Sequence, residues 1–444
     1  NNNNNNFNPR PNINNNNSGY FGAQQQQQQA PQQRQNDGNY ARELSNIISN
    51  MKNRQDVPGL LDLYAHNVNN LNAIHLANIY GAHAKGVRGA SKVTKLKTNW
   101  RFNNLLKMTS DKLQRTPNWF GVREIATITH SLGKLKIFDE RFFNEIGRRR
   151  ERIAKEGEPQ HLSMIVWACA TIGWKSVELL EAVAGEYERI AENGNVQAMS
   201  NICWAFATVG HEAKDLFKAV AAQHGRFVRD GNEQDVANTL WSFAIAGYLD
   251  EGRDLVEKLW NRACDGRLQF NVEELQQLAL FYAAAQIEEP NLNLEPPPES
   301  LLDQIEAAAA KQGVTVSREQ QYVSSTLNEL NIDHKMEVSP FEGSNVTFNT
   351  STMLNVDIVI SKNENKKVAI EFNGPSHYIQ FDGRDFSSGT TKFKRRLLVK
   401  TKFRRDEHPL GRLEKGERSR HTERVLAKFE SMVKKCLCPT KKFT

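Results

Sequence analysis

The chain has 444 residues, of which 25% are charged and 39% hydrophobic, and its formal net charge is +7. This composition supplies a sizeable core for two or three domains, and it contains no run of 18 apolar residues, so we expect no membrane span. The five cysteines form neither a disulfide framework nor two pairs at zinc-ligand spacing, and we expect reduced thiols.

The first 40 residues have the composition of a disordered segment. Tracts of a single residue type, Asn or Gln, occupy residues 1–6, 14–17 and 24–29. Such tracts have almost no apolar surface to bury. We therefore expect residues 1–40 to be disordered.

An apolar pattern of 12 residues then occurs three times and ends in glycine each time. The copies are Leu162–Gly173, Met199–Gly210 and Val236–Gly247. Their tryptophans, Trp167, Trp204 and Trp241, are 37 residues apart. A fixed pitch of this length is typical of a helical repeat array.

Each copy has the spacing of a helix that is buried on one face, and its glycine suits the left-handed position that ends a helix. More polar helices are expected over residues 176–192, 214–228 and 254–264, and weaker copies at 76–86, 122–133 and 275–286. We therefore expect five or six helical hairpins over residues 41–288. Because one hairpin cannot bury its apolar face alone, the pattern predicts an α-solenoid. We expect the three tryptophans to be core residues without a binding role.

A proline-rich linker, residues 289–300, separates the repeats from the rest of the chain. Beyond it, residues 317–330 have a helical pattern, and β patterns follow at 335–339, 354–360 and 367–372. Residues 301–444 are therefore expected to form a small α/β domain with a basic tail.

The positive charge is concentrated at this end of the chain. From Asp357 to the C-terminus there are 22 Lys and Arg against 11 Asp and Glu, whereas the preceding residues are slightly acidic overall. Such a density favours binding to phosphate backbones, although a solvated surface or a contact with a membrane or a protein produces the same pattern.

Two acidic residues fall on neighbouring expected strands. Asp357 lies within one strand and Glu371 at the end of the next. Two carboxylates placed in this way can hold one divalent cation, which then polarises a phosphodiester or activates water. They can equally cap their strands or pair with nearby lysines, and the spacing leaves both alternatives open.

Three segments of this domain resemble one known module. Residues 356–360 (VDIVI), 369–378 (AIEFNGPSHY) and 389–398 (GTTKFKRRLL) are similar to the RAP domain, an RNA-binding module, over a core of residues 318–401. The resemblance implies a fold like that of restriction endonucleases, in which Asp357 and Glu371 match two metal-binding acids. Asn373 stands where the nucleases have Lys, so the resemblance implies RNA binding rather than full nuclease activity.

Six residues of this domain are candidate RNA contacts: His377, Tyr378, Lys392, Lys394, Arg395 and Arg396. His377 can donate to a phosphate and Tyr378 can stack on an unpaired base, or both can pack on the domain's own helix. The four cations stand at the start of a helix, where positive charge is unfavourable unless an anion is present, and a bound phosphate would remove that conflict. A solvated basic face is the alternative.

The resemblance ends near Thr401. Residues 400–409 are charged where RAP domains continue with an aliphatic strand and a Trp-bearing segment, and no strand pattern is visible there. We expect a helix over residues 422–435.

Because a RAP-like domain follows them in the chain, the repeats resemble the octotricopeptide repeat family and the FAST kinase-like proteins. This resemblance implies a protein of the mitochondrial matrix or the chloroplast stroma that controls RNA processing, stability or translation, or ribosome assembly. Single-stranded RNA would follow the inner face of the array. The candidate phosphate contacts on the polar helices are Arg148, Arg149, Arg150, Arg152, Arg189, Arg226, Arg229 and Arg262.

Three functions therefore compete. The first is RNA binding without a cofactor, alone or with other ribonucleoprotein components. The second is a metal-dependent RNA endonuclease that uses Mg²⁺ at Asp357 and Glu371, beside Asn373. The third is a scaffold that binds only proteins in a ribonucleoprotein particle. Asn373 weighs against an enzyme.

Overall fold

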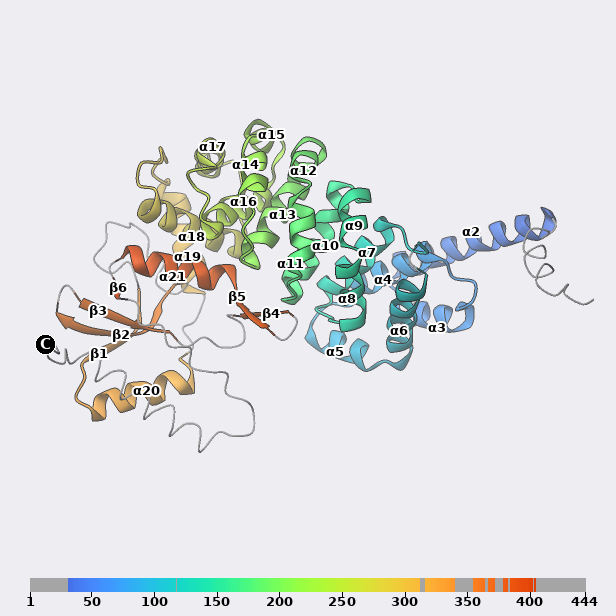
Figure 1. Ribbon diagram of the computed structural model, residues 1–444, viewed down its shortest axis with the longest axis horizontal. Coiled ribbons are helices and arrows are strands. Elements are labelled where there is room, and N and C mark those ends of the chain that lie inside the picture. Colours follow the sequence, from blue (N-terminus) through green and yellow to red (C-terminus); the bar gives the residue numbers. More distant parts are fainter. Residues whose placement is uncertain are drawn as a thin grey trace, which may run out of the picture. The chain divides into compact units, whose positions relative to one another are not determined.

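The computed structural model describes residues 31–116, 118–311, 316–339, 354–363, 366–371, 378–381, 384–401 and 403–404. Over these residues the protein is mostly helical, with a small sheet near the C-terminus (Figure 1). The contacts divide the chain into two compact units, residues 1–109 and 110–444. No helix in the described ranges is long and apolar enough to cross a membrane.

The first unit is built around a buried helix. It contains α2 (Pro31–Arg54), α3 (Val57–Asn67), α4 (Ala73–Gly86), α5 (Ala90–Thr98) and the first part of α6 (Trp100–Arg115). In α4, Leu76, Ile79 and Tyr80 are fully buried. Helix α2 begins inside the segment that we expected to be disordered, while residues 1–30 lie outside the described ranges.

The second unit contains five helices that carry the repeated pattern, here called the pattern helices. They are α7 (Val122–Lys134), α10 (Pro159–Ile172), α13 (Val196–Thr208), α16 (Glu233–Ala246) and α18 (Val272–Glu288). Each pattern helix contacts the next one in the chain. The apolar positions of the repeated pattern form the shared core, in which Ile165, Ile202 and Leu240 are fully buried.

Local signals fix both ends of these helices. Asn195 and Asn232 cap α13 and α16, each accepting a hydrogen bond from the backbone N–H three residues on. At the other end, Gly173 and Gly247 have left-handed backbones, with φ of 79° and 80°, and terminate α10 and α16 as the sequence predicts.

Two of the three expected polar helices, those at residues 176–192 and 214–228, are broken, and so is the segment after α7. The segments after α7, α10, α13 and α16 are α8 (Glu140–Arg148) with α9 (Arg150–Glu156), α11 (Val177–Ala184) with α12 (Tyr187–Asn193), α14 (Lys214–Ala221) with α15 (His224–Asp230), and the single helix α17 (Arg253–Cys264). The break lets the two halves pack on different neighbours. Helix α11 contacts α8 and α9, whereas α12 contacts α14.

The C-terminal part contains a four-stranded sheet in the order β1-β2-β3-β6. The strands are β1 (His334–Val338), β2 (Val356–Asn363), β3 (Lys366–Ile370) and β6 (Phe403–Arg404). The first three are antiparallel, and β6 runs parallel to β3. Helix α20 (Arg318–Glu329) packs on Ile358 and Ile360, and Leu398 of α21 (Gly389–Lys400) packs in a second cluster with Val356 and Val359.

The three expected strands and the helix expected at 317–330 are therefore present. Strand β6 forms at Phe403–Arg404, where no strand pattern is visible in the sequence, because pairing with β3 supplies its hydrogen bonds. Helix α19 (Glu299–Ala310) and the hairpin of β4 (Tyr378–Phe381) with β5 (Arg384–Ser387) were not foreseen. The helix expected at 422–435 lies outside the described ranges.

Candidate nucleic-acid interface

Helix α21 packs against the C-terminal ends of pattern helices α13, α16 and α18 (Figure 1). The approach is close at its first residue. A Cβ atom on Gly389 would lie 1.6 Å from the carbonyl oxygen of Ala207, so that only glycine fits there.

Three cations spaced four residues apart line one face of α21. This cation row consists of Lys392, Arg396 and Lys400. Lys392 Nζ donates to the carbonyl of Gly210 at 2.7 Å, and Lys400 Nζ donates to the carbonyl of Glu288 at 3.1 Å. Between them, Arg396 donates to the carbonyl of Ala244 at 2.6 Å. Each cation therefore reaches the C-terminal end of a different pattern helix.

These contacts resolve the electrostatic conflict seen in the sequence. Cations near the N-terminus of α21 need a negative partner, and the C-terminal ends of three helices carry partial negative charge. Protein carbonyls supply that partner to Lys392 and Arg396. The structure thus gives an intramolecular role to two of the four cations for which we expected phosphate.

The other two cations point into the α/β part. Lys394 Nζ donates to the Asn355 carbonyl at 2.6 Å and to Glu371 Oε2 at 2.5 Å. Arg395 donates to the Ser387 hydroxyl at 3.3 Å. Pairing of Glu371 with a nearby lysine was one of the alternatives that the sequence left open.

Asp357 lies in β2 and Glu371 directly follows β3, and each is next to one of the paired residues Ile358 and Ile370. Burial raises the pKa of Glu371 to about 7, the charge of Asp357 adds to the rise, and Lys394 opposes it. Across the described residues, no group of three or more His, Cys, Asp and Glu side chains is placed to hold a metal ion.

Three further candidates receive little or no description. Asn373 and His377 lie outside the described residues, and Tyr378 is described only as the first residue of β4. Their predicted roles stay predictions.

Four arginines of the polar helices connect consecutive repeats. These arginine staples are Arg149, Arg189, Arg226 and Arg262, which follow one another at 40, 37 and 36 residues. Each donates to backbone carbonyls near the end of a preceding helix. Arg226, for example, donates to Ala191 at 2.8 Å and also to Gly194. Their regular pitch was visible in the sequence, and it reflects capping of the preceding repeat.

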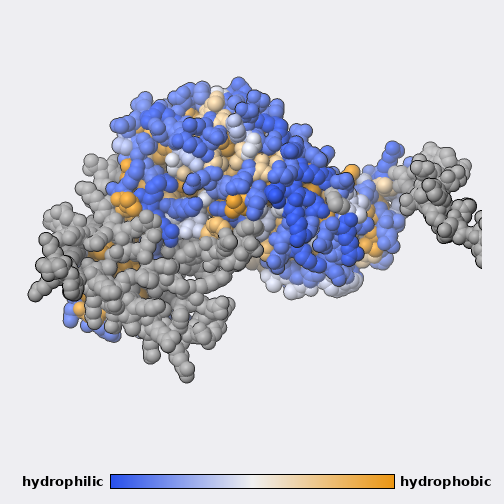
Figure 2. Space-filling view, in the orientation of Figure 1, coloured by the Kyte–Doolittle hydropathy of each residue, from blue (hydrophilic) through white to orange (hydrophobic). Residues whose placement is uncertain are grey.

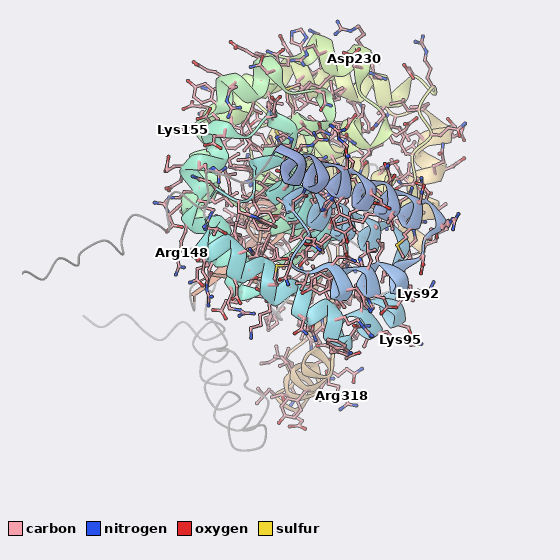
Figure 3. The ribbon with its side chains drawn as sticks, turned by 90° about the vertical axis from the view of Figure 1, so that its right-hand side faces the viewer. Lys92, Lys95, Arg148, Lys155, Asp230 and Arg318 are labelled. Atoms are coloured by element: carbon pink, nitrogen blue, oxygen red, sulfur yellow. The ribbon has the colours of Figure 1, made fainter. Side chains whose placement is uncertain are left out.

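The remaining candidate arginines pair with acidic neighbours close in sequence. Arg148 pairs with Glu145, Arg150 with Glu151, Arg152 with Glu156 and Arg229 with Asp230. The side chains of Arg148 and Arg229 are 67% and 69% exposed. Arg148 and Asp230 lie at the periphery of the second unit (Figure 3). Much of the surface that Figure 2 shows is hydrophilic.

The tryptophans of the pattern helices form a ladder of rings. The ring centroids of Trp167 and Trp204 are 6.4 Å apart, and those of Trp204 and Trp241 are 6.3 Å apart. His130 continues the ladder, 5.1 Å from Trp167. Trp241 is buried, as expected, but Trp167 and Trp204 are only half-buried, so the prediction of three core residues was wrong for these two.

Amide side chains accompany the rings. Gln160, Gln197 and Gln234 each stand seven residues before a tryptophan, which places them on the same helix face, and all three are exposed. Asn201 and Asn238 lie between glutamine and tryptophan in α13 and α16. We call this surface the amide–tryptophan stripe. An exposed glutamine repeated at one place in three copies does not serve core packing, and this signal was missed in the sequence.

Residues 92–293 match the model of a protein family described as RNA-editing substrate-binding complex 6 protein. The matched residues include all five pattern helices and end before α19. No curated protein matches the chain.

Proposed function

We propose that this protein binds single-stranded RNA along its pattern helices as part of an organellar RNA-processing complex. The family match over residues 92–293 carries the proposal, because the description of that family names the binding of RNA-editing substrates. The matched residues are those that contain the amide–tryptophan stripe.

The chemistry of the stripe supports this ligand. Unpaired bases stack on aromatic rings and expose donors and acceptors along their edges. The half-buried Trp167 and Trp204 offer ring surface, and exposed glutamines such as Gln197 offer both a donor and an acceptor. The stripe is therefore suited to contacts with bases, whereas cations around it would contact the phosphates.

The finer parts of the proposal follow from the resemblances. The pattern helices and polar helices would form an α-solenoid of the octotricopeptide type, and the sheet with α20 and α21 would be a RAP domain with a restriction-endonuclease-like fold. The protein would act in the mitochondrial matrix or the chloroplast stroma, together with other proteins of a ribonucleoprotein complex. RNA binding of this kind needs no cofactor.

Crosslinking in cells, followed by sequencing of the bound RNA, tests the proposal. We expect organellar transcripts, and we expect the purified full chain to bind them in the absence of Mg²⁺ with a steep dependence on salt. Recovery of protein partners without RNA would instead identify a scaffold and overturn the proposal.

A metal-dependent RNA endonuclease is a second candidate, and the position of Lys394 favours it. Its ammonium group lies 2.5 Å from Glu371 Oε2. It therefore places beside Asp357 and Glu371 the positive charge that the nuclease lysine would supply and that Asn373 lacks. Asp357 and Glu371 would hold Mg²⁺, which supplies Lewis-acid chemistry when bound. Cleavage that requires Mg²⁺ and disappears in both Asp357→Ala and Lys394→Met would establish this function.

A further inference from the structure

The first unit contains a long stretch of chain without acidic residues. Between Asp62 and Asp111 there is no Asp or Glu, although the chain as a whole has 51 of them. The seven cations of this stretch are Lys85, Arg88, Lys92, Lys95, Lys97, Arg101 and Lys107. Such an excess of one sign creates a positive field over the surface that carries it.

The structure places these cations in solvent. All except Arg101 are exposed, and α5 buries only Leu96, while Lys92 and Lys95 project outward (Figure 3). Arg101 pairs with Asp62 at 3.2 Å. The other six have no carboxylate partner in the part of the chain that the structure describes.

Helix ends account for only some of this charge. Lys95 and Lys97 stand in the last turn of α5, and Lys85 in the last turn of α4, where the helix dipole favours cations. Lys92 stands in the first turn of α5, where the dipole disfavours a cation, and Arg88 lies between the two helices. A bound anion would stabilise the positive charge at both of these positions.

An exposed aromatic ring adjoins these cations. Trp100, the first residue of α6, is 59% exposed, and the guanidinium carbon of Arg101 lies 4.7 Å from its ring centroid. A tryptophan as exposed as this contributes little to stability through core packing. An exposed ring beside cations that can bind phosphate is the arrangement that stacks an unpaired base.

We propose that Arg88, Lys92, Lys95, Lys97 and Trp100 form a second RNA-binding site, the basic α5–α6 surface. The lysines and Arg88 contact phosphates, and Trp100 stacks on one unpaired base. The inference rests on the proposed function for its ligand class, but this site belongs to the first unit, whereas the amide–tryptophan stripe belongs to the second.

The surface is less suited to a membrane. An interfacial helix needs a continuous apolar face beside its cations. The exposed positions of α5 other than lysine are Ala90, Ser91, Thr94 and Thr98, which offer little apolar surface. Trp100 is the one large exposed apolar side chain of the α5 and α6 residues that the structure describes.

The experiment measures binding of the full chain to a single-stranded oligouridine over a range of salt concentrations. The triple variant Lys92→Ala, Lys95→Ala, Lys97→Ala removes three phosphate contacts, so the slope of log Kobs against log salt should become shallower by about 2. The control variant Lys155→Ala, Lys218→Ala, Lys311→Ala removes the same charge from exposed positions elsewhere and should leave the slope unchanged.

Trp100→Ala tests the stacking. We expect about tenfold weaker binding to the single strand and unchanged binding to a duplex of the same length, because paired bases are not free to stack on the ring. Equal losses for both ligands would overturn the role of Trp100. Thermal melting of each variant separates lost binding from lost folding.

The outcomes distinguish this inference from the proposed function. If the wild-type chain binds no RNA, the proposed function fails and the second site fails with it. If the wild type binds but the triple variant keeps its slope, only the basic α5–α6 surface is refuted. The triple variant can also be tested with vesicles of anionic lipid. If it keeps RNA binding but loses vesicle binding, the basic α5–α6 surface binds a membrane, and its role as an RNA site is refuted.

Discussion

Arg396 of α21 and Glu288 at the end of α18 form an ion pair, with Nε 2.5 Å from Oε1, although 108 residues separate them in the chain. The Glu288 side chain is only 5% exposed. Because Arg396 also donates to the Ala244 carbonyl of α16, one side chain joins the ends of two pattern helices to α21.

Loss of this pair should loosen α21. Arg396→Gln leaves the Glu288 carboxylate buried without its partner, and we expect the free energy of unfolding to fall by about 2 kcal/mol, less than for a fully buried pair because Arg396 is partly exposed. Urea denaturation measures this change.

Arg395→Gln is the matched control, since Arg395 lies on the same turn of α21 and donates only to Ser387 at 3.3 Å among the described contacts. If both variants lose stability equally, the Arg396–Glu288 pair does not hold α21 in place.

The arginine staples should stabilise the stacking of repeats. Arg226→Ala removes donors from the carbonyls of Ala191 and Gly194, and we expect a loss of about 1–2 kcal/mol in the free energy of unfolding. Arg226→Lys should restore little of this, because a single ammonium cannot reproduce the guanidinium fork. Denaturant titration of both variants tests the prediction. Arg229→Ala, three residues on, removes only an exposed pair with Asp230 and should behave as the wild type.

Trp204 should matter for RNA binding because it is the middle ring of the ladder and is half-buried. Trp204→Ala should weaken binding of single-stranded RNA about tenfold, and Trp204→Phe should weaken it less, as filter binding or fluorescence anisotropy would report. Trp260→Phe is the control, since Trp260 is fully buried in α17, and its change removes core packing and the hydrogen bond to the Glu295 carbonyl without touching the ladder. Equal RNA affinity in the wild type and Trp204→Ala would exclude this ring from the interface.

Glu371 should make stability depend on pH. Its pKa is raised from 4.5 to about 7, so the folded protein holds a proton that the unfolded chain has released between these values. The contribution of Glu371 is therefore complete below pH 4.5 and is lost as the pH rises through 7, a change on the order of 3 kcal/mol.

The comparison of Glu371→Gln with the wild type isolates this effect, because His130, whose pKa burial lowers to about 4, contributes with the opposite sign in the same range of pH. We expect the difference in unfolding free energy between the two proteins to shift in favour of the variant as the pH rises from 4.5 to 7. A difference that does not vary with pH would contradict the raised pKa.

Much of the helical part could be predicted because its signals are local. The spacing of Leu162, Ile165, Val166 and Cys169 predicted α10, and Gly173 predicted its end. The break between α11 and α12 could not be predicted in this way, since the two halves pack on different neighbouring helices. Strand β6 was missed for a similar reason, because it exists through its pairing with β3.

The candidate site was predicted less well. The sequence identified Lys392, Lys394, Arg395 and Arg396 as a basic helix start, yet a row of cations looks the same whether its partner is a phosphate or a helix end. Glutamines recurring at the pitch of Trp167 and Trp204, and the acid-free stretch before Asp111, were both readable in the sequence. They went unnoticed because exposed polar residues are ordinarily solvated.

Local sequence signals suffice to predict the pattern helices, their caps and their pitch, because periodicity and capping act over a few residues of chain. What the cations and rings contact depends on the tertiary structure. It brings Lys392, Arg396 and Lys400 to the negative ends of three helices remote in sequence, and it leaves Trp167 and Trp204 only half-buried while Trp241 is buried. Charge and aromatic surface are properties of a residue, but their partners depend on which distant segments the fold brings together.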